Sequence, residues 1–182
     1  HTGNLRVLII GGSLGAVALN NSVFEAMQLL PENERPQLRH QAGKRNIEEV
    51  SEQYKAANID AEVTAFIDDM AAAYSWADLV VCRSGALTVS EVAAAGVAAV
   101  FVPFPFAVDD HQTANAQYLQ LQGAAIIRQQ TEMSAEWLAD LWQQLNTDRA
   151  LLRDMSKKAR SLAMTDATEH VVAEIRRFAR EQ

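Results

Sequence analysis

Short apolar runs alternate with helical patterns along most of the chain, and this alternation constrains the fold more than any other feature of the sequence. The runs "VLII" at 7–10 and "LVVC" at 79–82 are apolar throughout, so both of their faces should be covered. Repeated alternation of strand and helix is typical of a parallel sheet wrapped by helices on both faces. We expect about six strands, at 5–10, 37–41, 62–65, 78–82, 98–102 and 124–127.

Helical patterns fall between these strands and then fill the remainder of the chain. Trp137 and Trp142 have helical spacing with neighbouring leucines, which is typical of core or domain-contact residues. The chain has 182 residues, 49% of them hydrophobic, with no repeat and no linker, so the sequence indicates one Rossmann-like α/β domain. We expect helices at 16–29, 47–57, 70–76, 85–95, 111–121, 134–146, 148–163 and 166–180.

Composition excludes several classes of function. The net charge is −7 and no stripe of Lys and Arg appears, so we expect no nucleic-acid partner. Cys82 is the only cysteine, so no internal disulfide can form, and its apolar run indicates a small core residue in a reducing compartment. No apolar run approaches the roughly 18 residues of a membrane helix, so we expect this fragment to be soluble.

A glycine-rich loop follows the first predicted strand. Ligands of doubly wound sheets bind beyond the carboxyl ends of the strands, so the loops that follow strands are where chemistry is expected. Gly11, Gly12 and Gly15 permit tight turns and close approach of a ligand, and Ser13 adds a hydroxyl donor. The loop predicts a phosphate site, although a tight turn without a ligand has the same pattern. A dinucleotide is disfavoured, because the second strand ends in "RHQAGK", with no acidic residue for the ribose.

A second candidate site is the stretch "RSGALTVSE", which follows the fourth predicted strand. Gly85 and Ala86 at a helix start leave backbone amides free for a phosphate or its sugar. Glu91 could accept hydrogen bonds from both hydroxyls of a ribose, or it could form a helix-capping pair with Thr88. Arg83, at the end of the strand, is either the partner of an anion or a member of a structural ion pair.

Two further loops bring binding groups to the same edge of the sheet. After the fifth strand the chain passes two prolines and reaches "DDHQ", where His111, Gln112 and Asn115 could bind the hydroxyls of a sugar. Phe66 and Ile67 precede another predicted helix and could flank a flat base. Each feature alone has an ordinary structural explanation, whereas together they describe a site for a nucleotide sugar. We expect neither a metal ion nor a cofactor.

The chain closely resembles the C-terminal half of the MurG family in four motifs: "GGSLGA", "HQAGK", "FIDDMAAAYSWADLVVCRSGALTVSEVAAAG" and "PFPFAVDDHQTANAQYL". The similarity covers nearly the whole chain. Members of this family transfer N-acetylglucosamine (GlcNAc) from UDP-GlcNAc to lipid I, which yields lipid II for the bacterial cell wall. The resemblance implies a GT-B architecture, with two Rossmann-like domains facing across a cleft. Residues 1–182 would be the C-terminal, donor-binding domain, with 1–3 a cloning remnant and the N-terminal acceptor domain absent.

The resemblance also implies a role for each matching residue. Ser13 would contact the donor phosphates, Ile67 would meet the uracil through its backbone, and Glu91 would hold the ribose hydroxyls. Arg83 would lie at the donor site. The remaining positions are Ala86, Leu87 and Thr88, which would face the diphosphate and the neighbouring sugar, and His111 and Gln112, which would bind the GlcNAc hydroxyls.

Catalysis and membrane contact would lie mainly outside this chain. The reaction of the family is inverting, and its general base belongs to the N-terminal domain. We therefore expect no catalytic residue here, and UDP-GlcNAc binding without turnover. Lipid I and the cytoplasmic face of the bacterial inner membrane, where the family is peripheral, would be contacted through the missing domain. Two alternatives remain: the UDP-sugar-binding domain of another GT-B enzyme, and a non-catalytic docking module that uses the helical tail 134–182.

Overall fold

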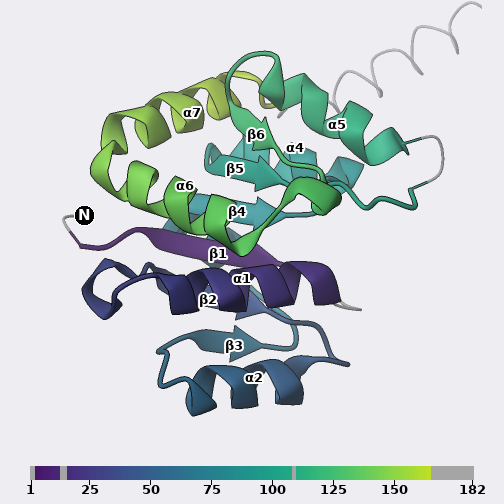
Figure 1. Ribbon diagram of the computed structural model, residues 1–182. Coiled ribbons are helices and arrows are strands. Elements are labelled where there is room, and N and C mark those ends of the chain that lie inside the picture. Colours follow the sequence, from purple (N-terminus) through teal and green to yellow (C-terminus); the bar gives the residue numbers. More distant parts are fainter. Residues whose placement is uncertain (1–2, 13–15, 108–109, 165–182) are drawn as a thin grey trace, which may run out of the picture.

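A single six-stranded parallel sheet organises the computed structural model, which describes residues 3–12, 16–107 and 110–164 (Figure 1). The strands lie in the order β3-β2-β1-β4-β5-β6, so the chain runs outward from β1 to β3 and then returns to place β4 beside β1. Such a reversal opens a crevice at the carboxyl ends of the two central strands. The strands are β1 (Arg6–Ile10), β2 (Gln37–Gln41), β3 (Glu62–Thr64), β4 (Leu79–Cys82), β5 (Ala98–Phe101) and β6 (Ala125–Ile127).

Helices follow the strands as the sequence predicts, and their ends differ from the predicted ends by at most two residues. The predicted helix at 166–180 lies outside the described residues. Short 3-10 turns, η1 (Glu32–Glu34) and η3 (Gln130–Glu132), lie in two of the connections. The α-helices are α1 (Val17–Leu29), α2 (Ile47–Ala56), α3 (Met70–Trp76), α4 (Ala86–Ala95), α5 (His111–Gln120), α6 (Ala135–Thr147) and α7 (Arg149–Ser161).

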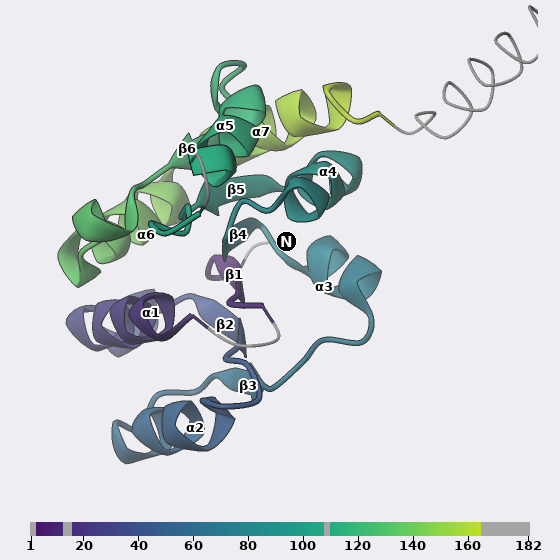
Figure 2. The same ribbon diagram turned by 90° about the vertical axis from the view of Figure 1, so that its right-hand side faces the viewer.

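Both faces of the sheet are covered, with α1, α2 and α6 on one side and α3, α4 and α5 on the other (Figure 2). Successive residues of a strand point to opposite faces. Val7 and Ile9 accordingly join the core beneath α1 and α6, whereas Leu8 joins the core beneath α3 and α4. The uniform apolar runs in the sequence therefore reflect two separate cores, one on each face of the sheet.

The buried residues bear out two of the sequence-based interpretations. Cys82 is fully buried, and this burial raises the pKa of its thiol, so it is a core residue and not a nucleophile. Trp142 is buried in the core beneath α1 and α6, and Trp137 packs against that core with its ring 4.9 Å from the Arg128 guanidinium. None of the helices within the described residues is long and apolar enough to span a bilayer.

Helix starts fall into two groups that differ in their capping. Asp69, Ser134 and Asp148 cap α3, α6 and α7 through side-chain oxygens that accept backbone N–H groups of the first turn. In contrast, no side chain within the described residues caps α1, α2, α4 or α5, and α1 and α4 start at Ala16 and Gly85, which have no polar side chain to act as a cap. These two helix starts follow β1 and β4, so their free amides lie at the crevice of the sheet.

Candidate functional site

The carboxyl ends of β1, β4 and β5 open onto a cavity of about 400 Å³. It lies where the strand order reverses, which is the usual place for a ligand in an open parallel sheet. The sequence-predicted residues Gly11, Arg83 and Gln112 all line it. The other lining residues are Ala16, Val17, Ala18, Phe104 and Gln130.

The glycine-rich loop begins with two positions that favour glycine, Gly11 because of close backbone neighbours and Gly12 because of its left-handed backbone. The Gly11 N–H donates to the Gln41 carbonyl at 3.2 Å. A Cβ added at Gly11 would lie 3.1 Å from that oxygen and 3.2 Å from the backbone nitrogen of Ala16, and Gly12 has a φ of +80°. The backbone is therefore bare beside the uncapped start of α1, which suits a phosphate. Ser13 and Gly15 lie outside the described residues.

A buried network holds the chain beneath this loop. The His40 imidazole is fully buried, with Nδ1 3.1 Å from the Tyr54 hydroxyl and Nε2 3.0 Å from Asn20 Oδ1. Asn20 Nδ2 donates to the Ala42 carbonyl, so its Oδ1 is the acceptor that faces His40, and we assign the imidazole proton to Nε2. Burial lowers the pKa of His40 to about 4. The neutral imidazole, which lies on β2, thus connects this strand to α1 through Asn20 and to α2 through Tyr54.

Arg83 supplies the positive charge of the cavity. Its guanidinium donates to the carbonyls of Val102 and Pro103 at 3.0 and 3.2 Å and to Gln130 Oε1 at 2.6 Å, and it lies 5.6 Å from the centroid of the Phe104 ring. No carboxylate within the described ranges pairs with it, so the interpretation of Arg83 as half of a structural ion pair is wrong. Burial lowers the pKa of Arg83, yet an arginine stays charged in proteins. A half-buried cation without a counter-ion favours an anionic ligand.

Gln112 and Asn115 connect the loops around the cavity. Gln112 Oε1 accepts the Phe104 N–H at 3.0 Å and lies 3.4 Å from the Ser84 nitrogen, while Asn115 Nδ2 donates to the Ser84 carbonyl at 3.1 Å. Gln112 Oε1 is therefore occupied within the protein. The two N–H groups on Nε2 could donate hydrogen bonds to a sugar hydroxyl. His111 begins α5 beside it with an exposed side chain.

The start of α4 presents a second set of free amides. Ala86 and Leu87 are exposed and Thr88 is half-buried, and the side chain of Ser84, just before the helix, is buried. No hydrogen-bond partner of the Ser84 hydroxyl oxygen is found among the described residues. A buried hydroxyl next to an uncapped helix start indicates a place for a polar ligand.

Glu91 and Ile67 do not line the cavity that contains Gln112. Glu91 is also absent from the lining of the cavity that Ile67 borders. Ile67, with Phe66 beside it, borders a separate cavity of about 330 Å³ between the end of β3 and the start of α3. Glu91 is half-buried on α4 and accepts a hydrogen bond from the Tyr74 hydroxyl at 3.0 Å. The alternative of a Thr88–Glu91 capping pair is wrong, because α4 begins at Ala86 with Gly85 as its N-cap, which places Glu91 beyond the first turn.

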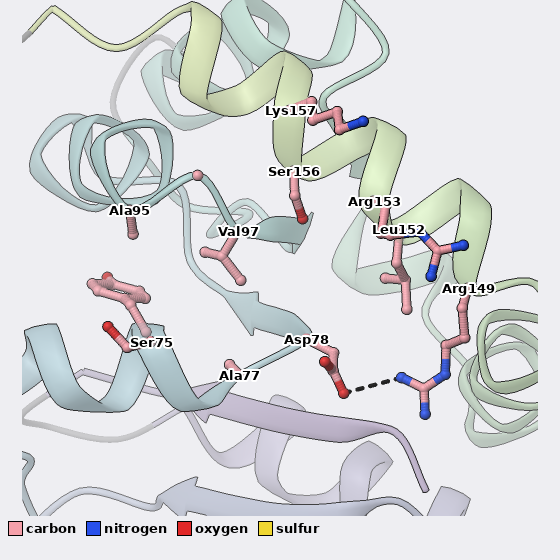
Figure 3. Close-up of a pocket in the computed structure, with 12 residues that line it drawn as sticks. Ser75, Ala77, Asp78, Ala95, Val97, Arg149, Leu152, Arg153, Ser156 and Lys157 are labelled. Carbon is pink, nitrogen blue, oxygen red and sulfur yellow. Dashed lines mark hydrogen bonds and ion pairs between the residues drawn. The ribbon is translucent and has the colours of Figure 1, made fainter. Parts of the chain in front are cut away.

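Another cavity, of about 440 Å³, lies at the opposite edge of the sheet (Figure 3). Asp78 and Val97, which line it, immediately precede β4 and β5, so it opens at the amino ends of these strands. Asp78 pairs with Arg149 of α7 at 3.0 Å, as the dashed line in Figure 3 marks. This ion pair ties α7 to the sheet, and none of the predicted site residues lies there.

Two residues of the site region escaped the sequence analysis. Gln130 contacts Arg83 from 47 positions along the chain, and no local pattern marks it. Tyr74 had a signal, because a tyrosine on the buried face of a predicted helix normally requires a hydrogen-bond partner for its hydroxyl.

The model of the Glycosyltransferase family 28 C-terminal domain matches residues 6–171 of the chain. This chain belongs to that family. The predicted resemblance to MurG is confirmed, because a crystal structure of Acinetobacter baumannii MurG is 50% identical with a TM-score of 0.86 and matches 96% of this chain and 50% of that one. Two solved glycosyltransferases that are 19% and 15% identical, with TM-scores of 0.66 and 0.64, share the fold of the family 28 domain.

Curated relatives of the family 28 domain are named UDP-N-acetylglucosamine--N-acetylmuramyl-(pentapeptide) pyrophosphoryl-undecaprenol N-acetylglucosamine transferase. The one from Cupriavidus metallidurans is 57% identical over 171 residues, which are 94% of this chain and 48% of the relative. The one from Marinobacter nauticus is 53% identical over 172 residues, which are 94% of this chain and 47% of the relative. The chain thus spans about half the length of the curated relatives it matches.

Proposed function

We propose that this family 28 domain binds UDP-GlcNAc and is the donor half of an inverting hexosyltransferase that converts lipid I to lipid II. The observation that carries the proposal is Arg83, a half-buried cation in the cavity at the switch point that has no carboxylate partner in the part of the chain that the structure describes. The uncapped starts of α1 and α4 face the same edge of the sheet and add amides that favour a diphosphate. The names of the relatives direct the choice among nucleotide sugars to UDP-GlcNAc.

Each group of residues takes one part of the donor. The glycine-rich loop and Arg83 hold the diphosphate, and the exposed start of α4 contacts the phosphate and the adjoining sugar. Glu91 accepts the ribose hydroxyls, and the backbone of Ile67 contacts the uracil. The residues proposed for these contacts are Gly11, Gly12, Ser13, Gly15, Ile67, Arg83, Ala86, Leu87, Thr88, Glu91, His111 and Gln112, of which the last two bind the GlcNAc hydroxyls.

The chemistry follows from where negative charge develops. When a hydroxyl of lipid I attacks the anomeric carbon, the bond to UDP breaks and the diphosphate gains negative charge. Fixed amides at the helix starts and the Arg83 guanidinium stabilise this charge without reorganising. The base that removes the proton of the attacking hydroxyl, the binding of lipid I and the contact with the cytoplasmic face of the bacterial inner membrane come from residues outside this chain. Residues 1–182 therefore act as one donor-binding domain that turns over nothing alone.

Calorimetry of the purified chain with UDP and with UDP-GlcNAc tests this function. We expect both ligands to bind, and Arg83→Ala to weaken both by about ten- to a hundredfold, because a hydrogen bond to a charged group is worth about 1.5–3 kcal/mol. The matched control is Arg153→Ala, which removes an exposed cation from α7 at the opposite edge and should leave the affinity unchanged. An Arg83→Ala variant that is folded and binds UDP as the wild type does would refute the proposal.

Two further results separate the alternatives. Competition by other UDP-sugars as strong as that by UDP-GlcNAc would favour another GT-B enzyme. Absence of any nucleotide binding, together with capture of a protein partner through the helical tail, would favour a docking module. Lipid II formation by the isolated chain would contradict the absence of a catalytic base.

A further inference from the structure

Tyr74 forms a hydrogen bond with Glu91, one of the residues proposed to bind the donor. It lies on the buried face of α3 with 6% of its surface exposed, and its hydroxyl donates to Glu91 Oε2 on α4 at 3.0 Å. Burial raises the pKa of Tyr74, and the nearby Cys82 and Glu91 raise it further. The hydroxyl therefore keeps its proton at any physiological pH and acts as a permanent donor to the carboxylate.

The hydrogen bond fixes one side of the Glu91 carboxylate and leaves the other side available. Oε1 of Glu91 accepts no hydrogen bond from a described residue, whereas Oε2 is held by Tyr74. A glutamate side chain without such a contact samples several rotamers and loses this freedom when it binds a ligand. A carboxylate held in advance loses less on binding, which increases affinity without any new contact to the ligand.

The same bond joins two parts of the proposed site. Tyr74 belongs to the helix that follows Ile67, and Glu91 belongs to the helix that follows Arg83. The segment that would contact the base is thus connected to the segment that would contact the diphosphate, and in a uridine nucleotide the ribose joins these two groups. The side chain of Tyr74 packs in the core cluster of Leu8 and Cys82 and also lines the cavity at the amino ends of β4 and β5.

We propose that Tyr74 is a positioning residue for the donor, which orients the Glu91 carboxylate toward the ribose hydroxyls of UDP and does not itself touch the ligand. This inference rests on the proposed function, because it needs Glu91 to bind the ribose. It also predicts a ligand dependence that a purely structural role of Tyr74 would not produce: the benefit of its hydroxyl exists only for nucleotides that carry ribose hydroxyls.

The test compares UDP with 2′,3′-dideoxy-UDP in the wild type and in Tyr74→Phe, which keeps the ring and removes only the hydroxyl. We expect the Kd for UDP to rise about three- to tenfold in Tyr74→Phe and the Kd for the dideoxy nucleotide to stay unchanged. In a Glu91→Ala background, Tyr74→Phe should have no further effect on UDP. The matched control is Tyr118→Phe, which removes a hydroxyl that donates to the Leu162 carbonyl at 2.8 Å, and it should bind both nucleotides as the wild type does.

The outcomes distinguish this inference from the proposed function. An equal loss for both nucleotides in Tyr74→Phe, or an unchanged affinity for UDP, would overturn the positioning role while the donor site stands. Equal affinities of the wild type for UDP and dideoxy-UDP would remove the ribose contact of Glu91, and with it the role of Tyr74. A wild type that binds neither nucleotide would overturn the proposed function and this inference together.

Discussion

Lowering the pH from about 7 to about 5 should destabilise the fold through one buried imidazole, that of His40. In the folded chain this ring is neutral, because burial lowers its pKa from 6.5 to about 4 and its two nitrogens are bonded to Tyr54 and Asn20. The unfolded chain takes up the proton below about pH 6.5, whereas the folded chain resists it until about pH 4. Between these values the unfolded state binds more protons, so the stability that His40 contributes is complete above about pH 6.5 and is lost as the pH falls.

The size of the effect follows from the two pKa values. The interval from 6.5 down to about 4 corresponds to about 3 kcal/mol in total, at about 1.4 kcal/mol per unit. About 2 kcal/mol of this should be lost between pH 7 and pH 5. Carboxylates with ordinary pKa values are still mostly ionised at pH 5, so they change their charge little across this range.

Urea unfolding followed by tryptophan fluorescence at pH 7, 6 and 5 measures the change, and an NMR titration of the imidazole assigns it to His40. The control is His40→Gln, which removes the buried titrating group, so the unfolding free energy of the folded variant should depend less on pH across this range. An unfolding free energy that is flat from pH 7 to 5, or a His40 that titrates near 6.5 in the folded chain, would refute the assignment of a neutral, desolvated ring.

Two other substitutions test the site itself. Glu91→Ala should weaken UDP binding by about 1–3 kcal/mol in calorimetry, because a charged acceptor is lost. The control is Glu52→Ala, which removes an exposed carboxylate from α2 and should leave UDP binding unchanged. Unchanged UDP affinity in a folded Glu91→Ala variant would contradict the assignment of Glu91 to the ribose. Gly11→Ala should lower the unfolding free energy in urea by about 1–3 kcal/mol, because its Cβ would press on the backbone of Gln41 and Ala16, at 3.1 and 3.2 Å. An unfolding free energy of Gly11→Ala equal to that of the wild type would show that the backbone of the loop can shift to accommodate the Cβ without a loss of stability.

Most of the fold could be predicted from the sequence because it depends on periodicities that any window of the chain displays. Strands covered on both faces are apolar at every position, as Val7, Leu8 and Ile9 are, and the two cores divide them alternately. Glycines at a strand-to-helix turn likewise report a local backbone requirement, which Gly11 and Gly12 confirm.

The alternatives at Arg83 and Glu91 could not be decided in that way, since each depended on partners distant in the chain. The acceptors of the Arg83 guanidinium lie 19, 20 and 47 positions further on, and the hydroxyl that holds Glu91 lies 17 positions before it. A capping pair and an ion pair were both plausible from spacing. The capping pair is wrong because α4 begins at Ala86, and the Arg83 guanidinium donates to two backbone carbonyls and to Gln130, with no carboxylate partner among the described residues.

The amino-acid sequence by itself determined the layered α/β architecture, and it predicted the edge of the sheet at which we propose that a ligand binds and the residue types present there. Only the tertiary structure showed that, among the described residues, the Arg83 cation has no carboxylate partner and Glu91 Oε1 accepts no hydrogen bond. The physical reason is that secondary structure follows from contacts a few residues apart, whereas the availability of a polar group for a ligand depends on every segment that folds against it.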